Sequence, residues 1–513
     1  MLKAGVKAFQ MARGLKKLKK CGNERGEVLA AKYLTQILEN ERGLFFKLAQ
    51  YMGTNPSSSE QLKELSQRSS DTVDLDQVKN KIEESYHKKW DELFLSIDKK
   101  AFCASLGQVH RAVLLDGSEV AIKLQYPGIR EEIEQQLKLF KLLPLANNLG
   151  PLKKWGIPID EYRQMIRDVF DQELDYLSEI KNQLAFKENN KDYPWVVTSD
   201  ILPQYKSSTI YLQSYLKGDN ISQVAAKWSD TEKRLLGKRL LESFLINFFY
   251  HGFIQGDSNH GNFLFNRQED SVEICFLDFG NCATFSEKFR FALLKLIEIT
   301  AQETDEDPLP YLIEMGFDPK KLTHIHCSLP LLCKSLLAPF LAPYAYKISE
   351  WQLEKEIELI LGETKWWFRS SGSTEFFALI KAFLGVKNLI QKLEVPIFWS
   401  GILKQVAAPL SDSLKDYAVT SYSKESYTFN SIAKKLRISV TKEGIEKVNL
   451  TFPIATLLDL EDYIENDIAE QLEKRQISLK SLVQDSLQKG CLPGSIFDLK
   501  EETPSKRYHV WLE

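Results

Sequence analysis

Several features that mark specialised protein classes are missing from this chain of 513 residues. Its seven cysteines include no Cys-x-x-Cys pair, and an odd, scattered set is typical of reduced thiols. The N-terminus lacks the apolar run of a secretory signal, and no run of about 18 apolar residues predicts a membrane span. A net charge of −3 and the lack of basic-aromatic alternation predict no nucleic-acid binding. We therefore expect a cytoplasmic protein that at most touches a membrane from outside.

The ends of the chain differ in composition from its middle. Residues 1–20 carry seven Lys or Arg and no acidic residue, so they form either a solvated helix end or an anchor on anionic lipid. Residues 430–513 contain four short strand patterns around two helical ones, which predicts a ββααββ module. This module has no chemical motif, and we expect it to bind a protein partner if it binds anything.

Two acidic motifs in the middle of the chain carry the first chemical signal. Asp257 and Asn262 are five residues apart after an apolar helix, and Asp278 begins an Asp-Phe-Gly sequence at the end of a predicted hairpin. In phosphoryl transfer such an Asn and Asp hold Mg²⁺ on the nucleotide phosphates, and the loop Asp orients the attacking hydroxyl. The alternative is an Asx-rich turn with a buried Asp cap.

A lysine and a glutamate earlier in the chain complete this pattern. Lys123 lies on the second strand of a hairpin predicted over residues 109–126, on its less apolar face, where it can reach nucleotide phosphates. Glu179 lies on a long helix predicted over residues 160–188 and is the natural ion-pair partner. Without the later motifs, Lys123 would be read as a surface lysine. In place of a glycine-rich phosphate loop stands an alanine-containing one, whose candidate backbone contacts are Ala101, Ala104, Ser105 and Gly107.

Taken in order, these motifs resemble the UbiB/AarF family of atypical, protein-kinase-like kinases. The matching pieces are a KxGQ-like sequence from Lys47 to Gln50, the alanine-containing loop, the lysine strand, an ExD element at Glu173 and Asp175, and the loop from Gln255 to Asn262. The sequence departs from the family at Ala49, at Phe102 and Cys103, and at Gln255-Gly256, where the family usually has His-Ala.

The resemblance implies an α+β fold, bilobal and protein-kinase-like, with ATP and Mg²⁺ as cofactors. Lys123 and Glu179 would pair between the lobes, Asp257 would be catalytic, and Asn262 and Asp278 would bind the metal. Lys47 and Gln50 would lie on a regulatory extension over the cleft, with Lys47 near Glu173 and Asp175. The implied domains are an N-terminal extension (1–60), an N-lobe with inserted helices (61–220), a helical C-lobe (221–420) and the C-terminal module (430–513).

The activity expected from these observations is that of an ATP- and Mg²⁺-dependent kinase or ATPase. Helical patterning resumes near residue 286, soon after Gly280, and no Ala-Pro-Glu follows, so a peptide substrate has little surface to dock on. This favours a small or lipidic acceptor, which the resemblance relates to quinone and isoprenoid-lipid metabolism. The alternative is a pseudokinase-type scaffold for a lipid-metabolic complex that binds nucleotide without turning it over.

Overall fold

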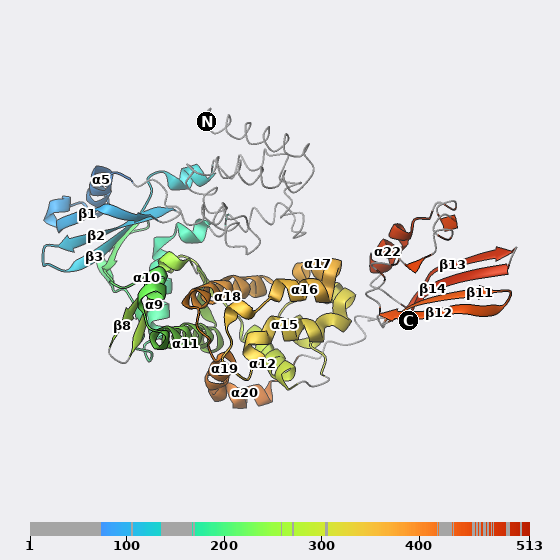
Figure 1. Cartoon of the computed structure of the whole chain (residues 1–513). Helices are drawn as coiled ribbons and strands as arrows, with labels where there is room; N and C mark the ends of the chain where they lie inside the picture. The colour runs from blue at the N-terminus through green and yellow to red at the C-terminus, as the bar shows by residue number, and fades with distance from the viewer. Residues whose placement is uncertain are drawn as a thin grey trace. The chain divides into compact units, whose positions relative to one another are not determined.

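The structure is a computed structural model that describes residues 73–134, 170–417 and 433–513 apart from short gaps, among them 104–105 and 258 (Figure 1). The predicted extension over residues 1–60, with Lys47 and Gln50, lies outside the described residues, as do Ala104 and Ser105. The described residues divide into two compact units. The first runs to Thr284 and includes Leu379–Val395, and the second comprises Phe285–Ala378 and Pro396–Glu513.

The first unit begins with helix α5 (Leu75–Tyr86) and a five-stranded antiparallel sheet. Asp74 caps the start of α5, and His87 ends it in the left-handed conformation (φ 54°). The apolar pattern of residues 61–97 predicts helix, which is wrong beyond Tyr86, because strand β1 already begins at Phe94. The sheet has the order β1-β2-β3-β6-β5, with the bounds Phe94–Cys103, Gly107–Leu114, Glu119–Gln125, Ile210–Ser214 and Ile201–Lys206.

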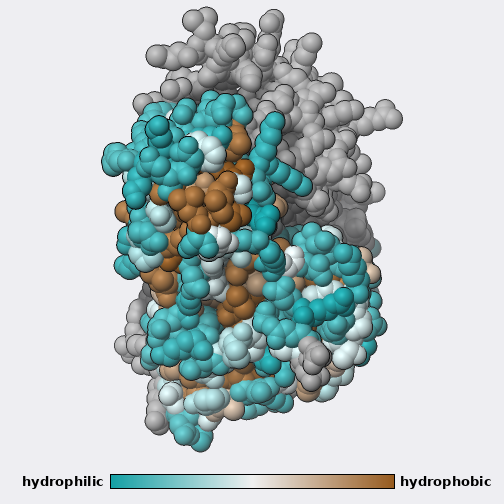
Figure 2. All heavy atoms as spheres, turned by 90° about the vertical axis from the view of Figure 1, so that its left-hand side faces the viewer, coloured by the Kyte–Doolittle hydropathy of each residue, from teal (hydrophilic) through white to brown (hydrophobic). Residues whose placement is uncertain are grey.

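Both faces of this sheet are covered at its centre, since every residue of β3 from Val120 to Gln125 is buried. Val78 and Ile82 of α5 are fully buried in one apolar cluster with residues of β1, β2, β3 and β6. The side of the molecule in Figure 2 is hydrophilic over most of its area, with smaller hydrophobic patches between. Among the described residues of β1 to β3 and their turns, the large apolar side chains that stay more than half exposed are Leu95, Phe102 and Leu115.

Helix α9 (Tyr176–Asn189) follows in the same unit and carries Glu179 in its first turn. Its start corrects the prediction of one continuous helix over residues 160–188. The chain leaves the helical conformation at Asp175, whose carboxylate accepts hydrogen bonds from the backbone N–H groups of Leu177 (3.2 Å) and Ser178 (3.1 Å). An Asp in this position starts a new helix because it satisfies donors that have no partner inside the helix.

The rest of the first unit holds the loop motifs between short strands. Helix α11 (Asp230–Ile246) starts with a capping box at Ser229. A π-helical turn (Asn247–His251) follows it and ends at Gly252, which has the left-handed conformation. Two small sheets follow: β7 with β10, and β4, β9 and β8 in the order β4-β9-β8. Their bounds are Phe253–Gln255, Cys282–Thr284, Val196–Thr198, Val272–Phe276 and Phe263–Arg267.

From α12 (Glu287–Ala301) to α20 (Ser411–Asp416) the chain is mostly helical, as the sequence predicts. This stretch belongs to the second unit apart from Leu379–Val395. Pro319–Leu341, which ends with α15 (Leu329–Leu341), has by length and composition alone the character of a membrane span, with a mean hydropathy of 1.2. Leu329 and Leu332 of this stretch are fully buried inside the described structure. Burial of this kind is also typical of the core helix of a globular unit.

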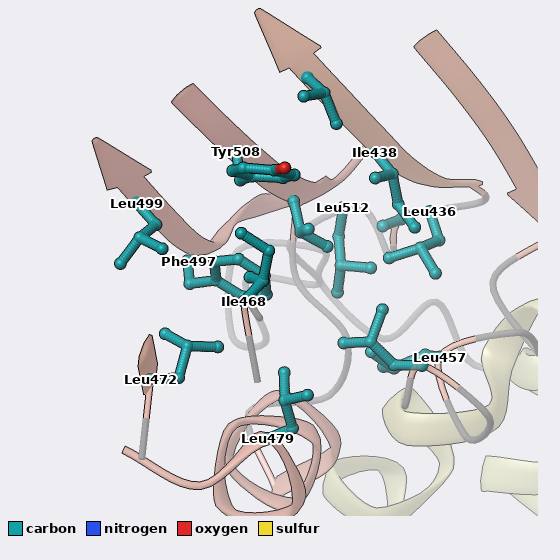
Figure 3. Packing of buried hydrophobic residues seen from close by; sticks show 14 residues of the cluster. Leu436, Ile438, Leu457, Ile468, Leu472, Leu479, Phe497, Leu499, Tyr508 and Leu512 are labelled. Carbon is teal, nitrogen blue, oxygen red and sulfur yellow. The ribbon is translucent and has the colours of Figure 1, made fainter. Parts of the chain in front are cut away.

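The C-terminal module is a four-stranded antiparallel sheet in the order β12-β11-β14-β13. Alternate residues of the strands form its core; Figure 3 shows Leu436, Ile438 and Leu512 from the sheet facing Leu479 of helix α22 (Leu479–Gln488). The strand and second-helix predictions agree with the structure, while most of the first predicted helix, 455–474, lies outside the described residues. The strands are β11 (Lys435–Lys442), β12 (Ile445–Pro453), β13 (Gly494–Glu502) and β14 (Ser505–Leu512).

Candidate active site

Lys123 lies at the centre of a buried charged cluster. Strand β3 holds it between Val109 of β2 and Tyr211 of β6, and its side chain is almost fully buried. Its Nζ donates to Glu179 Oε1 and, at 2.7 Å, to Asp278 Oδ2. These partners are 56 and 155 residues away in the sequence, so the fold brings together three of the predicted site residues.

The two carboxylates keep this lysine charged. Burial by itself would lower the pKa of Lys123, but the carboxylates of Asp278 and Glu179 outweigh that effect and hold the pKa well above its ordinary value. Glu179 is 1% exposed, so an unpaired charge on it would be costly in this position. Burial raises the pKa of the Glu179 carboxyl, and the charge of Lys123 opposes that rise, so the charged form of Glu179 depends on the lysine.

Asp278 differs from Glu179 because its carboxylate reaches solvent. A quarter of its side chain is exposed. Its Oδ1 accepts from the backbone N–H of Gly280 at 2.9 Å, while Oδ2 faces Lys123. Each carboxylate oxygen can still accept a further contact, so this group can bind a cation as well as the lysine.

The loop that carries Asp257 is tied to the Asp-Phe-Gly turn through one amide. Gln255 Nε2 donates to the backbone carbonyls of Asp257 (2.6 Å) and Asp278 (3.2 Å). Asn262 Nδ2 donates to the same Asp257 carbonyl at 3.0 Å, which turns its amide oxygen away from that loop. The backbone of Leu277 donates to the Asn262 carbonyl (3.0 Å), so Asn262 lies beside the residue that precedes Asp278.

Asn262 and Asp278 together offer oxygen atoms of the kind that Mg²⁺ prefers. Among the described residues, no group of three or more His, Cys, Asp or Glu side chains could hold a metal ion. A carboxylate and an amide with few further ligands suit Mg²⁺, which commonly keeps water and nucleotide phosphates in its coordination shell. The residues present thus fit a Mg²⁺-nucleotide.

The described residues of the alanine-containing loop belong largely to strands β1 and β2. Ala101 lies within β1, opposite His110 of β2, and Gly107 is the first residue of β2. A Cβ on Gly107 would collide with the backbone carbonyl of Leu124 and come within 2.8 Å of the Tyr176 hydroxyl. This close packing accounts for the glycine without any ligand, and contact of the loop with phosphate stays a prediction.

The ExD residues lie next to the Asp-Phe-Gly turn. The Cα of Glu173 is 3.9 Å from the position that a Cβ on Gly280 would occupy. Asp175 caps α9, and its hydrogen bond to the Ser178 hydroxyl is the largest cause of the lowered pKa of its carboxyl. Their predicted contact with Lys47 falls outside the described residues and stays a prediction.

Two contacts at the site have no counterpart in the sequence prediction. Tyr176 and Tyr211 pack edge to face with ring centroids 5.3 Å apart, and the Tyr176 ring lies 5.6 Å from Lys123 Nζ. Asn182 Nδ2 donates to the Phe279 carbonyl at 3.1 Å. The one available signal for Asn182 is its spacing of three residues from Glu179, which places both on one side of a helix.

Comparison with known proteins identifies the kinase-like part of the chain. Residues 65–309 match the family described as the ABC1 atypical kinase-like domain. The atypical kinase coq-8 of Caenorhabditis elegans is 25% identical over 71% of this chain and 49% of its own length. COQ8 of Saccharomyces cerevisiae is 25% identical over 62% of this chain and 64% of its own length. The chain thus spans about half to two thirds of the length of these curated relatives.

A solved structure supports the fold. The chain resembles the Rv3197–erythromycin complex from Mycobacterium tuberculosis with a TM-score of 0.51 at 20% identity, over 64% of this chain and 82% of that one. At this identity the likeness shows the fold alone. Residues 65–309 are therefore an ABC1 atypical kinase-like domain, and the resemblance to the UbiB/AarF family that the motifs predict is confirmed.

Proposed function

We propose that this chain is an ATP- and Mg²⁺-dependent atypical kinase or ATPase. The observation that carries the proposal is the cluster of Lys123, Glu179 and Asp278, in which two charges are buried and the third reaches solvent. Lys123 would hold the nucleotide phosphates, and Glu179 would keep the lysine in place. Mg²⁺ would neutralise charge on the transferred phosphoryl group.

In this proposal the remaining site residues act on the acceptor and the metal. Asp257 would orient the attacking hydroxyl and accept its proton, and Asn262 and Asp278 would hold the metal. The hydrogen bonds of Gln255 to both loops support this assignment, because they keep the backbone of Asp257 beside that of Asp278. The backbone of the alanine-containing loop, at Ala101, Ala104, Ser105 and Gly107, would cover the phosphates.

For the acceptor we propose a small or lipidic molecule rather than a peptide. Helix α12 begins at Glu287, so only six residues lie between Gly280 and the helix. So short a segment gives a peptide little surface. The relatives are named as COQ8 kinases, in keeping with a role related to ubiquinone, and several of those names include the word mitochondrial. The cellular location, contact with anionic lipid and a protein partner for the C-terminal module stay predictions.

ATP turnover by the purified chain tests the proposal. We expect turnover that requires Mg²⁺, with a loss of about 100-fold or more in Asp257→Asn, the typical range for a general base. Asp192→Asn is the matched control, because Asp192 is an exposed aspartate of the same unit. Binding of Mg-ATP without turnover in either protein, with or without liposomes, would instead favour the nucleotide-binding scaffold.

A further inference from the structure

Three backbone groups at Asp278 and Phe279 have side-chain partners. The carbonyl of Asp278 accepts from Gln255 Nε2 at 3.2 Å. The N–H of Phe279 donates to Glu179 Oε1 at 3.2 Å. The carbonyl of Phe279 accepts from Asn182 Nδ2 at 3.1 Å. The turn that presents the candidate metal ligand is thus held by specific side chains rather than by backbone pairing.

Three of the contacts to Phe279 come from helix α9. Glu179 bonds its N–H, Asn182 bonds its carbonyl, and Phe186 packs on its ring with the centroids 5.1 Å apart. Residues at i, i+3 and i+7 lie on one face of a helix. One face of α9 therefore contacts the N–H, the carbonyl and the ring of Phe279.

Asn182 differs from the other two side chains because it contacts the Asp-Phe-Gly turn and has no second partner of the kinds that they have. Glu179 also pairs with Lys123, and Phe186 is a core residue that packs on Phe276 as well. Asn182 is half-buried, and its only hydrogen bond within the described residues goes to Phe279. Without that donor the Phe279 carbonyl would keep only the weaker hydrogen bond from Cys282 Sγ (3.5 Å), which favours rotation of the peptide.

We propose that Asn182 is a positioning residue that couples helix α9 to the metal ligand Asp278. By fixing the Phe279 peptide it holds the adjacent carboxylate where Oδ1 meets the Gly280 N–H and Oδ2 meets Lys123. A shift of α9 then moves Glu179 and Asp278 together. The nucleotide site and the metal site therefore form at the same time. The part of this inference that concerns Mg²⁺ rests on the proposed function.

Hydrogen exchange in the nucleotide-free protein tests the coupling without any ligand. The Gly280 N–H belongs to the same peptide group as the Phe279 carbonyl and donates to Asp278 Oδ1. In Asn182→Ala and in the isosteric Asn182→Asp, which removes the donor, we therefore expect the Gly280 amide to exchange about 5- to 10-fold faster, the effect of losing one typical hydrogen bond. Asn189→Ala is the control, because Asn189 lies on the same helix without a hydrogen bond from its side chain in the described structure. Equal exchange at Gly280 in all variants would overturn the proposal, as would uniformly faster exchange along the whole of α9.

Nucleotide binding then tests the link to the metal. The Mg²⁺ concentration that half-saturates ATP binding should rise about fivefold in Asn182→Ala while the melting temperature without ligand stays near that of the control. An unchanged Mg²⁺ requirement with faster exchange at Gly280 would overturn the coupling to Asp278. Failure of the wild-type chain to bind Mg-ATP would instead refute the proposed function, and the exchange experiment would still decide whether Asn182 holds the turn.

Discussion

The kinase-like domain and the C-terminal module place their charged groups differently. In the domain, Lys123 and Glu179 are 5% and 1% exposed. In the module, the ion pair between Arg507 and Asp498 lies at the surface, and the buried cluster consists of apolar side chains and one tyrosine. Burying charge is unfavourable unless the charges are paired, and a protein core gains nothing in stability over well-packed apolar residues by doing so. The difference indicates where the chain performs chemistry.

The largest effect should follow from breaking the buried cluster. Lys123→Met leaves Glu179 buried without its cation, which we expect to lower the free energy of unfolding by about 3 kcal/mol or more. Urea unfolding measures this loss. Adding Glu179→Gln should recover much of the stability but not nucleotide binding, because the second change removes the uncompensated charge. A single variant as stable as wild type would mean that the charges are not buried together.

In the module a comparable loss should come from an apolar residue instead. Leu436 is fully buried, so Leu436→Ala should cost about 2–5 kcal/mol by opening a cavity. Because none of the candidate site residues comes from the module, Mg-ATP should bind this variant as it binds wild type. Calorimetric titration beside a urea series checks both points. Weakened nucleotide binding by Leu436→Ala would contradict the claim that the module takes no part in the nucleotide site.

Two glycines of the N-lobe, Gly107 and Gly117, should differ in how well they tolerate a side chain. Gly107→Ala forces a methyl group against the Leu124 carbonyl, and overpacking of this kind costs about 3 kcal/mol. Gly117 (φ 85°) has open space around it, so Gly117→Ala should cost only about 1 kcal/mol for the left-handed backbone. Thermal unfolding ranks the two variants. The reverse order would show that strand β2 can move away from Leu124 at Gly107 at little cost.

The smallest effect should come from the surface pair of the module. The hydrogen bonds from Arg507 hold the pKa of the Asp498 carboxyl below its ordinary value. The stabilisation is therefore complete above about pH 4, the ordinary range of an aspartate, and is lost as pH falls through the lower folded pKa. Wild type and Arg507→Ala should differ slightly in urea midpoint at pH 6 and converge on acidification. A difference that grows below pH 4 would contradict this sign.

The order of the motifs carries information on long-range pairing that periodicity does not contain. Lys123 pairs with Glu179 in the structure, while the contact of Lys123 with Asp278 was not predicted and the roles of these residues stay predictions. Strand β1 was missed because its register against β2 shifts twice and its alternation is weak. The break before α9 was missed because an N-cap at Asp175 looks like any helical aspartate when apolar spacing continues through it.

The contacts that orient the backbone could not be predicted. The bond of Asn182 to Phe279 and those of Gln255 to Asp257 and Asp278 join a side chain to a main-chain carbonyl. Every residue has a main-chain carbonyl, so the sequence does not indicate which carbonyl a side chain will bond. The same limit applies to Gly107, whose close neighbour is the main chain of Leu124.

Binding of ATP as a function of Mg²⁺ concentration, in wild type and in Asp278→Asn, tests the central claim most directly. The claim is that a buried lysine–glutamate pair presents one solvent-accessible carboxylate to a metal-bound nucleotide. We expect Mg-ATP to raise the melting temperature of the wild-type protein and not that of the variant, whose neutral amide is a weaker ligand for a hard cation. Equal stabilisation of both proteins by Mg-ATP would remove Asp278 from the site and contradict the account.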